Sequence, residues 1–330
     1  MAIVTAPPDP QLAASQHRQK LQLTLIAYIL PAATIGLMIY FSFTTSAFLT
    51  SGNLLAVATQ NAPTFVVAVV AALLMMAGYI DLSVGSTMAV SGVAAGLMFN
   101  SAGILPGILV GLAAGLAVGL LNGYFIGFQN FSPIVVTLGL LAAGRGVALF
   151  LAPQSVFGFP QGVIAFGSDR VGGVSYLVMV AVVVTIVTMI VFNRLPVGKH
   201  IVAIGVNKRA AYLNGIHVKR ITLGLYAATG VAAATAGLLQ VARLNSAPSA
   251  TLGSGFEVTI LTAVLLAGIP AEGGRGAIWR VLVAAWLIAV LGNGLTLMNV
   301  GVEMSGIITG AVLVAAAGLE AVRRKIRSSS

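Results

Sequence analysis

The sequence predicts an all-α polytopic membrane protein with about ten transmembrane helices, and two observations carry that prediction. Hydrophobic residues make up 58% of the 330 residues and charged residues only 7%, against roughly a quarter charged in soluble domains. No acidic or basic residue occurs in residues 21–80 or in residues 82–144. Each of these stretches must hold several spans, because one helix crosses the hydrocarbon core in about 20 residues.

The first five spans follow a polar lead that ends at Lys20. This lead, residues 1–20, lacks the layout of a secretory signal and is expected to be a tail. Gly- or Pro-containing breaks separate the apolar runs, and irregular backbone cannot face lipid, so the breaks are expected at interfaces or under a cover of protein. The runs predict spans at 21–41, 54–77, 82–99, 104–121 and 133–151.

Five further apolar runs complete the expected bundle. They predict spans at 174–192, 221–241, 258–269, 277–297 and 305–319. The run at 258–269 is short for a span of about 20 residues, and the segment 193–220 is the only long charged stretch. The expected organisation is a transmembrane domain at 21–322 that contains the loop 193–220, between an N-terminal tail at 1–20 and a basic C-terminal tail at 323–330.

Basic residues predict the orientation of the chain. They gather in the two tails, in the loop 193–220 and in the segment 275–280. An even number of spans places all four on one side, and the positive-inside rule makes that side the cytoplasm. Only Arg145, Arg170 and Arg243 lie elsewhere. We therefore expect a multi-pass protein of a bacterial inner membrane with both termini in the cytoplasm, and the net charge of +10 needs no nucleic-acid partner.

Small residues predict close helix packing. The chain contains 39 glycines, and four of them recur at every fourth position in Gly107, Gly111, Gly115 and Gly119. Such spacing lets helices approach closely in lipid, where no hydrophobic force drives them together. Tight packing is the expected role of this stripe.

Several kinds of catalytic site are excluded. Gly198–Lys199 is followed by His200, so the Ser or Thr that a phosphate-binding Walker A loop needs is missing. The three histidines, His17, His200 and His217, lack metal-ligand spacing, and without Cys there is no thiolate site. No catalytic residue, metal or cofactor is expected, and any ATP must be hydrolysed by another chain.

Two ionisable residues stand in or beside expected spans, where such costly groups persist for function or structure. Asp81 lies at the junction of two runs and is expected to cap the following helix, a role favoured over proton relay because a carboxylate accepts free amide protons there. Arg145 lies deep within the span 133–151. Structural hydrogen bonding and lining of a translocation path are left open for it.

Further polar residues fall into two groups. Arg243 and Glu257 are expected at the outer face, where helix dipoles favour them as structural anchors and where they could also meet an external partner. Residues expected to line a path or to serve structure are, beside Asp81 and Arg145, Ser83, Asn122, Thr137 and Asn293.

The loop 193–220 contains one predicted short helix. Residues 203–215 form a helical pattern that ends at Gly215, a residue typical of helix ends. Ile204 and Ala211, with Val206, Ala210 and Leu213, would form its apolar side, and Lys208 and Arg209 would face outward. Such a helix lies on lipid or inserts in a groove of a partner, and a plain basic loop is the third alternative.

Four blocks of sequence, in this order, resemble permeases of ribose-type ABC importers, a family that includes ribose, xylose, rhamnose and autoinducer-2 permeases. GYIDLSVGSTMAVSG (78–92) is similar to the family's GGIDLSVG signature, and LNGYFIGFQNFSPIVVTLGLLAAGRGVAL (121–149) to its NG, Pro-containing turn, VTLG and RG. GKHIVAIGVNKRAAYLNGIHVKR (198–220) resembles its GR-x-x-x-AIG-x-N-x-x-AA-x-x-SGI. LLAGIPAEGGRG (265–276) resembles its GG-x-x-x-x-GGRG turn.

The resemblance implies an ABC importer permease fold and three partners besides membrane lipid. These are a second permease chain, identical or related, a cytoplasmic ABC ATPase that binds ATP and Mg, and a periplasmic or lipid-anchored solute-binding protein. Closing of the ATPase dimer would switch a central cavity between outward and inward access. By the resemblance, the ATPase-coupling residues are Ala203, Ile204, Gly205, Asn207, Lys208, Arg209, Ala210, Ala211, Leu213 and Gly215.

The blocks also depart from the family pattern. Tyr79 replaces the usual second glycine and crowds that turn, Asn214 stands where a small Ser is common, and Pro270 stiffens the last block. The expected solute is a monosaccharide or similar small polar molecule, with a nucleoside or branched-chain amino-acid ABC permease as alternatives. A different class, an ion-coupled secondary transporter, would carry more ionisable residues within its spans.

Overall fold

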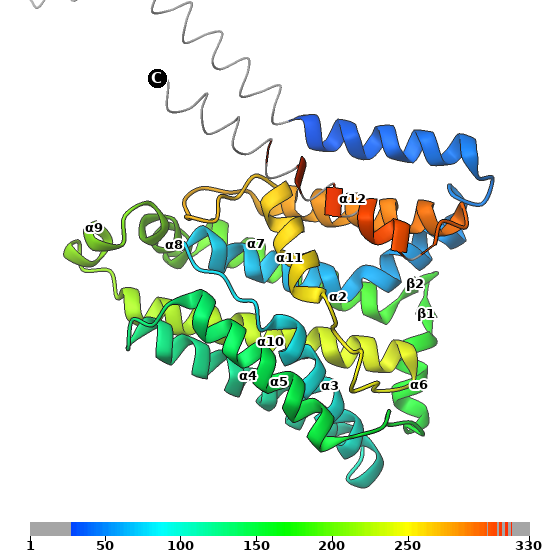
Figure 1. Cartoon of the computed structure of the whole chain (residues 1–330), viewed down its shortest axis with the longest axis horizontal. Coiled ribbons are helices and arrows are strands. Elements are labelled where there is room, and N and C mark those ends of the chain that lie inside the picture. Colours follow the sequence, from blue (N-terminus) through cyan, green and yellow to red (C-terminus); the bar gives the residue numbers. More distant parts are fainter. Residues whose placement is uncertain (1–27, 302, 309, 312–313, 316–317, 319–330) are drawn as a thin grey trace, which may run out of the picture.

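The computed structural model describes residues 28–301, together with 303–308, 310–311, 314–315 and 318, and these form a bundle of helices (Figure 1). The expected tails at 1–20 and 323–330 lie outside the described residues, as does part of the expected span at 305–319. After the helix Tyr28–Thr44, the elements are α2 (Ser51–Met76), α3 (Val84–Ser101), α4 (Ile104–Gly127), α5 (Pro133–Leu151), α6 (Gln161–Ser168), β1 (Arg170–Val171), β2 (Val174–Ser175), α7 (Tyr176–Arg194), α8 (Pro196–Val206), α9 (Lys208–Leu213), α10 (Val218–Leu244), α11 (Phe256–Leu266) and α12 (Ile278–Leu297).

Six of the described helices are long and apolar enough to cross a membrane, namely α2, α4, α5, α7, α10 and α12. The prediction of an all-α polytopic protein is therefore confirmed, whereas the count of ten spans is not. Helix α3 is long enough but rich in Gly, Ser and Thr. Helix α11 has 11 residues, which at a rise of about 1.5 Å per residue cover only about half of a hydrocarbon core about 30 Å thick.

The start of α7 corrects an expected boundary. Residues Val174 and Ser175, expected to open a span, instead form strand β2, which pairs antiparallel with β1. Gly172 and Gly173 have φ angles of 60° and 85°, as the two-residue turn of such a hairpin requires. Helix α7 begins only at Tyr176, because the Ser175 hydroxyl accepts a hydrogen bond from the amide of the third residue on and caps the helix.

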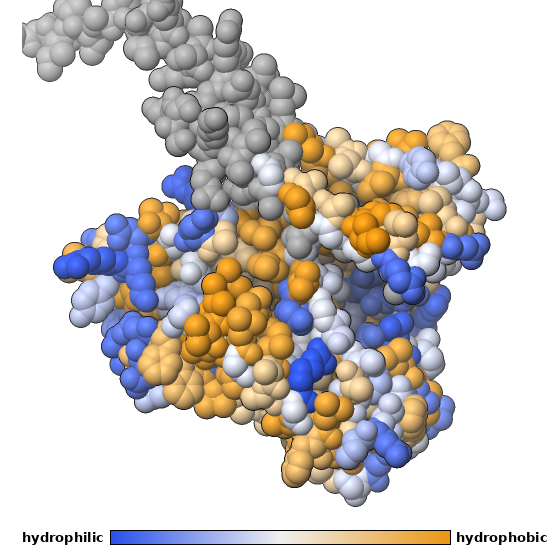
Figure 2. All heavy atoms as spheres, in the orientation of Figure 1, coloured by the Kyte–Doolittle hydropathy of each residue, from blue (hydrophilic) through white to orange (hydrophobic). Residues whose placement is uncertain are grey.

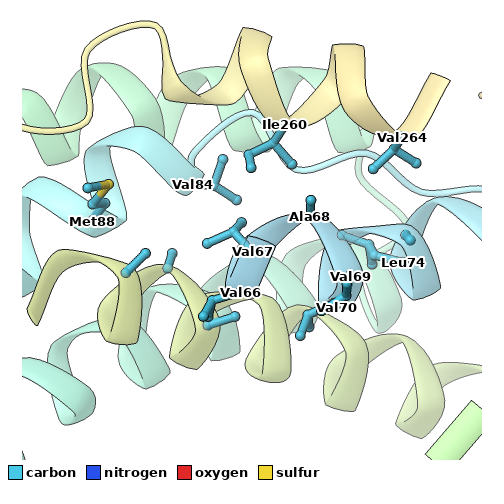
Figure 3. Packing of buried hydrophobic residues seen from close by; sticks show 14 of the residues in the cluster. Val66, Val67, Ala68, Val69, Val70, Leu74, Val84, Met88, Ile260 and Val264 are labelled. Carbon is cyan, nitrogen blue, oxygen red and sulfur yellow. The ribbon is translucent and has the colours of Figure 1, made fainter. Parts of the chain in front are cut away.

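Helix α2 lies at the centre of the bundle. From Phe65 to Met76 it is apolar on all sides, as expected of a helix that other helices surround, and it packs against α7, α10, α11 and α12. Figure 3 shows its side chain Val67 near Val84 of α3 and Ile260 of α11, and Leu74 on the side of Val264 of α11. This packing holds the first turn of α3 and the short helix α11 side by side.

The glycine stripe of α4 packs closely against α3 and α10. Gly107, Gly111, Gly115 and Gly119 are all buried. A Cβ built on Gly115 would collide with the carbonyl oxygen of Gly230 in α10. Only glycine lets the two backbones approach this closely, so the tight-packing interpretation is confirmed.

The outer surface of the bundle is apolar along its flank. Large side chains such as Val135 and Phe150 of α5 are exposed, at 69% and 86%, and Figure 2 shows hydrophobic residues over the flank that α4 and α5 form. Hydrophilic residues gather at the end that carries α8 and α9. A monomer with such a flank is stable only against lipid or another apolar surface.

Candidate functional site

Helices α8 and α9 occupy one end of the bundle, at the left of Figure 1. The sequence predicted one helix over 203–215, and this is wrong, because the segment is divided at Asn207. The Asn207 backbone is extended, with φ −158°, and its side-chain oxygen accepts a hydrogen bond of 2.9 Å from the amide of Ala210. Asn207 therefore ends α8 and caps the start of α9.

The end of α9 agrees with the prediction. Gly215 has a φ of 81°, which favours glycine. Its amide donates to the Tyr212 carbonyl at 3.0 Å, and the Ile216 amide donates to the Ala211 carbonyl at 3.1 Å. These two bonds form a Schellman motif, which satisfies the last carbonyl groups of the helix.

The two helices have one buried and one exposed apolar face. Ile204 and Ala211 are buried, as expected, and Ala203 packs partly against the core. Val206 and Leu213, expected on the same side, are instead 70% and 74% exposed. Ala210, also expected on that side, is exposed too, whereas the exposure of Lys208 and Arg209 agrees with the prediction. Tyr212, which the sequence pattern did not single out, is 68% exposed.

Gly205 sits where three of the four sequence blocks meet. The amide of Gly274 donates to the carbonyl of Met76, the last residue of α2, at 2.9 Å. A Cβ on Gly205 would lie on that same carbonyl oxygen and 2.6 Å from the Gly274 nitrogen. A Cβ on Gly273 would lie 2.7 Å from the nitrogen of Gly78. We call Gly78, Gly205, Gly273 and Gly274 the glycine junction.

Asp81 does not cap α3, contrary to expectation. One of its carboxylate oxygens accepts hydrogen bonds from the amide of Ser83 at 2.8 Å and from the Ser83 hydroxyl at 2.6 Å, so Asp81 forms a turn that precedes the helix. Ser83 occupies the N-cap position of α3, and its side chain makes no capping hydrogen bond. Asn122 of α4 donates to the Ser83 hydroxyl at 2.8 Å. The structure thus brings three predicted residues together.

This polar cluster is deeply buried. Ser83 and Asn122 have no exposed surface, and among the described residues nothing donates a hydrogen bond to the Asn122 side-chain oxygen. A buried polar group without a partner is costly, and ordered water commonly supplies one. The same cluster ties the link between α2 and α3 to α4.

Glu257, expected at the outer face, is half-buried and lies against the first turn of α3. It opens α11, whose 11 residues reach only about half of the way through a hydrocarbon core. A Cβ on Gly85, in the first turn of α3, would overlap a carboxylate oxygen of Glu257. Glu257 and Asp81 also line the same small cavity. A negative charge at this place is stabilised by the amino end of α3.

Arg145 of α5 holds the segment that leads into α11. Its two terminal nitrogens donate to the carbonyl groups of Leu252 and Gly253. Gly253 and Gly255 have φ angles of 68° and 70°, so this turn is irregular backbone inside the bundle and needs such donors. Hydrogen bonding is thus the role that the contacts of Arg145 support.

The remaining predicted residues make local or paired contacts. The Thr137 hydroxyl is buried and donates to the Pro133 carbonyl one turn earlier, and Arg243 donates to the Gln240 side chain at 3.3 Å. Asn293 of α12 and Asn53 of α2 exchange two amide hydrogen bonds, at 2.9 and 3.0 Å. Among the described residues, no group of His, Asp and Glu side chains is suited to hold a metal ion.

We expect that removing either partner of the Asn53–Asn293 pair destabilises the chain. Substituting Asn293 with Leu leaves the partly buried side-chain oxygen of Asn53 without its donor, although the Asn53 amide still donates to the Phe48 carbonyl at 2.8 Å. The expected cost is about 1–3 kcal/mol in the free energy of unfolding. Unfolding of the purified chain in mixed micelles measures this loss. The double variant Asn53→Leu, Asn293→Leu is expected to lose less than the sum of the single variants, and strict additivity would contradict the pairing.

Comparison with known proteins agrees with the sequence blocks. A family model described as the permease component of branched-chain amino acid transport systems matches residues 53–317. The chain is 30% identical, over 86% of its length and 87% of the relative, to the D-allose transport system permease protein AlsC of Escherichia coli K12. It is 32% identical to the ribose import permease protein RbsC of Bacillus subtilis, over 86% of this chain and 89% of that protein. It is 31% identical to the autoinducer 2 import system permease protein LsrD of Escherichia coli O157:H7, over 76% and 78%. No solved structure matches the chain.

Proposed function

This chain belongs to the family of permease components described for branched-chain amino acid transport systems, and we propose that it is the membrane-spanning subunit of an ATP-binding cassette importer. Members of this family are transport subunits, so the chain is not an enzyme. In this proposal it spans the bacterial inner membrane several times, with α8, α9 and both termini in the cytoplasm. Solute moves inward by alternating access.

The observation that carries the proposal is the exposed apolar face of α9 at the basic end of the bundle. Tyr212 and Leu213 are 68% and 74% exposed beside the charged Lys208 and Arg209. Apolar side chains on a short helix that projects from the bundle (Figure 1) suit insertion in a groove of a partner protein. We assign that groove to a cytoplasmic ATPase, which binds ATP and Mg.

Motion of the ATPase reaches the membrane helices through the glycine junction in this proposal. Gly205 near the end of α8 contacts the backbone of both Met76 and Gly274. Backbone contacts of this kind cannot yield by a change of rotamer, so displacement of α8 displaces the end of α2 and the turn before α12 together.

The solute path is proposed to lie between this chain and a second permease chain, identical or related. The supporting feature is the partly buried irregular backbone at residues 77–83 and 245–255, which precede α3 and α11. Irregular backbone at membrane depth is tolerated where protein covers it or a water-filled cavity adjoins it. Asp81, Ser83, Asn122 and Glu257 gather beside these segments and give the path its polar groups.

The proposed solute is a monosaccharide or a similar small polar molecule, delivered by a solute-binding protein on the outer face. The names of the relatives, which include D-allose, ribose and autoinducer 2 permeases, support this class. A nucleoside or branched-chain amino acid is the alternative within the same transporter class, and the family description supports the latter. Ion-coupled transport without an ATPase is the alternative outside it.

Substituting Leu213 with Glu is expected to abolish capture of the ATPase while the chain remains in the membrane. The change places a charge on the face proposed to enter the groove, at a position 74% exposed and therefore free of packing in this chain. Ala211 is unsuited to the same test because it is buried. The measurement is co-purification from native membranes in mild detergent, with the bound proteins identified by mass spectrometry.

Val171 supplies the matched control for this test. It is 53% exposed on strand β1, at the opposite end of the bundle (Figure 1), and Val171→Glu should retain the ATPase. Equal recovery of the ATPase with Leu213→Glu would contradict the assignment of α9. Recovery of the wild-type chain alone, with uptake driven by an ion gradient, would contradict the importer class.

A further inference from the structure

Tyr79 is a buried aromatic residue in the link between α2 and α3. It is 6% exposed, and it occupies the turn that directly follows Gly78 of the glycine junction. A large side chain at such a turn needs room and partners. Three side chains from two other helices surround the ring, and each contact has a separate physical basis.

Two of these contacts come from α10. The Tyr79 and Tyr226 rings pack edge to face, with centroids 6.1 Å apart, an arrangement that aromatic quadrupoles favour. The Thr222 hydroxyl donates to the Tyr79 hydroxyl at 3.2 Å. Tyr226 in turn donates its hydroxyl proton to the carbonyl of Ile80 at 3.0 Å. The link is therefore attached to α10 through the Tyr79 side chain and through the Ile80 carbonyl group.

The third contact comes from α9. The ammonium group of Lys208, the first residue of α9, lies 5.4 Å from the centroid of the Tyr79 ring, within the range of a cation–π interaction. Lys208 is exposed while the Tyr79 ring is buried. The contact therefore joins a long, flexible side chain at the surface to an aromatic ring that is fixed inside the bundle. It connects α9 to the α2–α3 link, separately from the backbone contacts that Gly205 of α8 makes.

The link runs directly from Tyr79 into the polar cluster. Asp81 is two residues further on, and its carboxylate receives the two hydrogen bonds from Ser83 that precede α3. Residues 79 to 83 contain no helix, and contacts with Thr222 and Tyr226 and the bond between Asp81 and Ser83 fix their position instead. Because the link is held by packed contacts, a shift of the Tyr79 ring displaces the turn that begins α3.

We propose that Tyr79 is a positioning residue through which α9 controls the α2–α3 link, and with it the start of α3. Movement of α9 changes the Lys208–Tyr79 contact, and the ring, held on its other side by Tyr226 and Thr222, reorients the link. This inference rests on the proposed function only in that an ATPase supplies the movement of α9. The Tyr79 contacts themselves do not depend on a partner.

The chain offers a matched control for the Lys208–Tyr79 contact. Lys219 of α10 lies 5.9 Å from the centroid of Phe128, just beyond the end of α4. Both lysines are exposed and both contact an aromatic ring. Phe128, however, is not part of the α2–α3 link. Lys219→Met therefore removes a cation–π contact of the same kind without touching the link.

The test measures amide hydrogen exchange of residues 77–83 in the permease–ATPase complex in lipid nanodiscs, with and without ATP plus vanadate. In the wild type we expect the nucleotide to change the exchange rate by about tenfold, which corresponds to about 1.4 kcal/mol. Tyr79→Gly and Lys208→Met should reduce this change in the exchange rate to less than twofold, which corresponds to less than about 0.4 kcal/mol. Tyr79→Phe, which keeps the ring, and Lys219→Met should retain the full response.

The exchange rate of each variant with nucleotide is compared with the rate of the same variant without nucleotide. A substitution that changes exchange equally in both states therefore leaves the nucleotide response unchanged. Should Tyr79→Gly fail to fold, Lys208→Met, at an exposed position, carries the test alone. A full response in Lys208→Met or in Tyr79→Gly would overturn the inference while leaving the proposed function intact. So would a wild-type complex that hydrolyses ATP without any change in the link.

A second measurement is independent of the ATPase. In the permease chain alone, Lys208→Met should accelerate exchange of residues 77–83, and Lys219→Met should not. If the chain has no ATPase partner, this comparison still decides whether α9 is connected to the link through Tyr79. Equal exchange in both variants would reject the connection.

Discussion

Substituting Gly205 with alanine is expected to destabilise the chain strongly. The new Cβ would overlap the Met76 carbonyl oxygen and approach the Gly274 nitrogen to 2.6 Å. Both are backbone atoms, and the Met76 oxygen already accepts the Gly274 amide. Neither side can yield by a change of rotamer, so the junction must separate. We expect a loss of about 3 kcal/mol or more in the free energy of unfolding.

The control is the same substitution at Gly224. This glycine lies within α10, and a Cβ there would meet nothing within 4 Å. In a helix interior, alanine is preferred over glycine by about 0.5–1 kcal/mol, so Gly224→Ala should be neutral or stabilising. Equilibrium unfolding of both variants in mixed micelles gives the comparison directly. Equal stability of Gly205→Ala and Gly224→Ala would contradict the junction.

The junction also predicts a functional loss in Gly205→Ala. If α8 transmits the motion of an ATPase to α2 and to the turn before α12, separating the three segments uncouples them. We expect the variant to reach the membrane and retain the exposed face of α9, because Leu213 lies outside the junction. ATP hydrolysis by the complex should then continue without solute uptake. Loss of both activities in equal measure would indicate a defect of assembly instead.

The second large effect is expected from Arg145→Met. This change removes both hydrogen bonds to the Leu252 and Gly253 carbonyl groups, each of the charge-assisted kind worth about 1.5–3 kcal/mol. The turn at Gly253 and Gly255 has positive φ angles and makes no regular helix, so it depends on such donors. We expect a loss of about 3 kcal/mol in stability and faster amide exchange in residues 250–256.

Arg145→Lys separates charge from geometry in this prediction. Lysine keeps the positive charge but presents it as a single point, whereas arginine offers two parallel donors for two neighbouring carbonyl groups. The Lys variant should therefore fall between the wild type and Arg145→Met. If Arg145→Lys is as unstable as Arg145→Met, the two-carbonyl geometry and not the charge decides. If Arg145→Met equals the wild type, Arg145 does not hold this turn.

The amino-acid pattern alone was sufficient for the membrane class, for most of the long helices and for the family. Long apolar runs without charge are typical of membrane spans, so α5 was predicted to the residue and α2, α10 and α12 to within three residues, whereas α4 extends six residues beyond the predicted end. Close packing of α4 also followed from the glycine spacing, although the partner helices did not. The capping glycine at Gly215 was readable for the same local reason.

The division at Asn207 could have been found in the sequence. Asparagine is a favoured capping residue, and Lys208 to Leu213 follow it with good helix formers. One continuous helix was predicted because the spacing of apolar residues was weighted more heavily than the capping preference of Asn207. As a result, Val206 and Leu213 were expected on the same face as Ile204, whereas the break at Asn207 turns them outward.

Other features depended on contacts between distant parts of the chain. Hydrophobic periodicity does not reveal which backbone atoms pack against Gly205, or that the Glu257 carboxylate lies against Gly85. It also does not reveal where α11 ends within the bundle. Tyr79 stood out in the sequence only as a crowded turn, and its partners Lys208, Thr222 and Tyr226 lie more than 100 residues away. Such pairs are chosen by the packing of whole helices.

The sequence by itself determined that this protein lies in a membrane, how its long helices follow one another and to which permease family it belongs. These properties follow from the cost of exposing charge or unpaired backbone to lipid, which acts on each segment separately. The tertiary structure alone decided that Asp81, Ser83 and Asn122 form one cluster, that three sequence blocks meet at the glycine junction, and that Tyr79 joins α9 to the start of α3. Those contacts arise because close packing admits few arrangements of these helices, and no local pattern records which one is adopted.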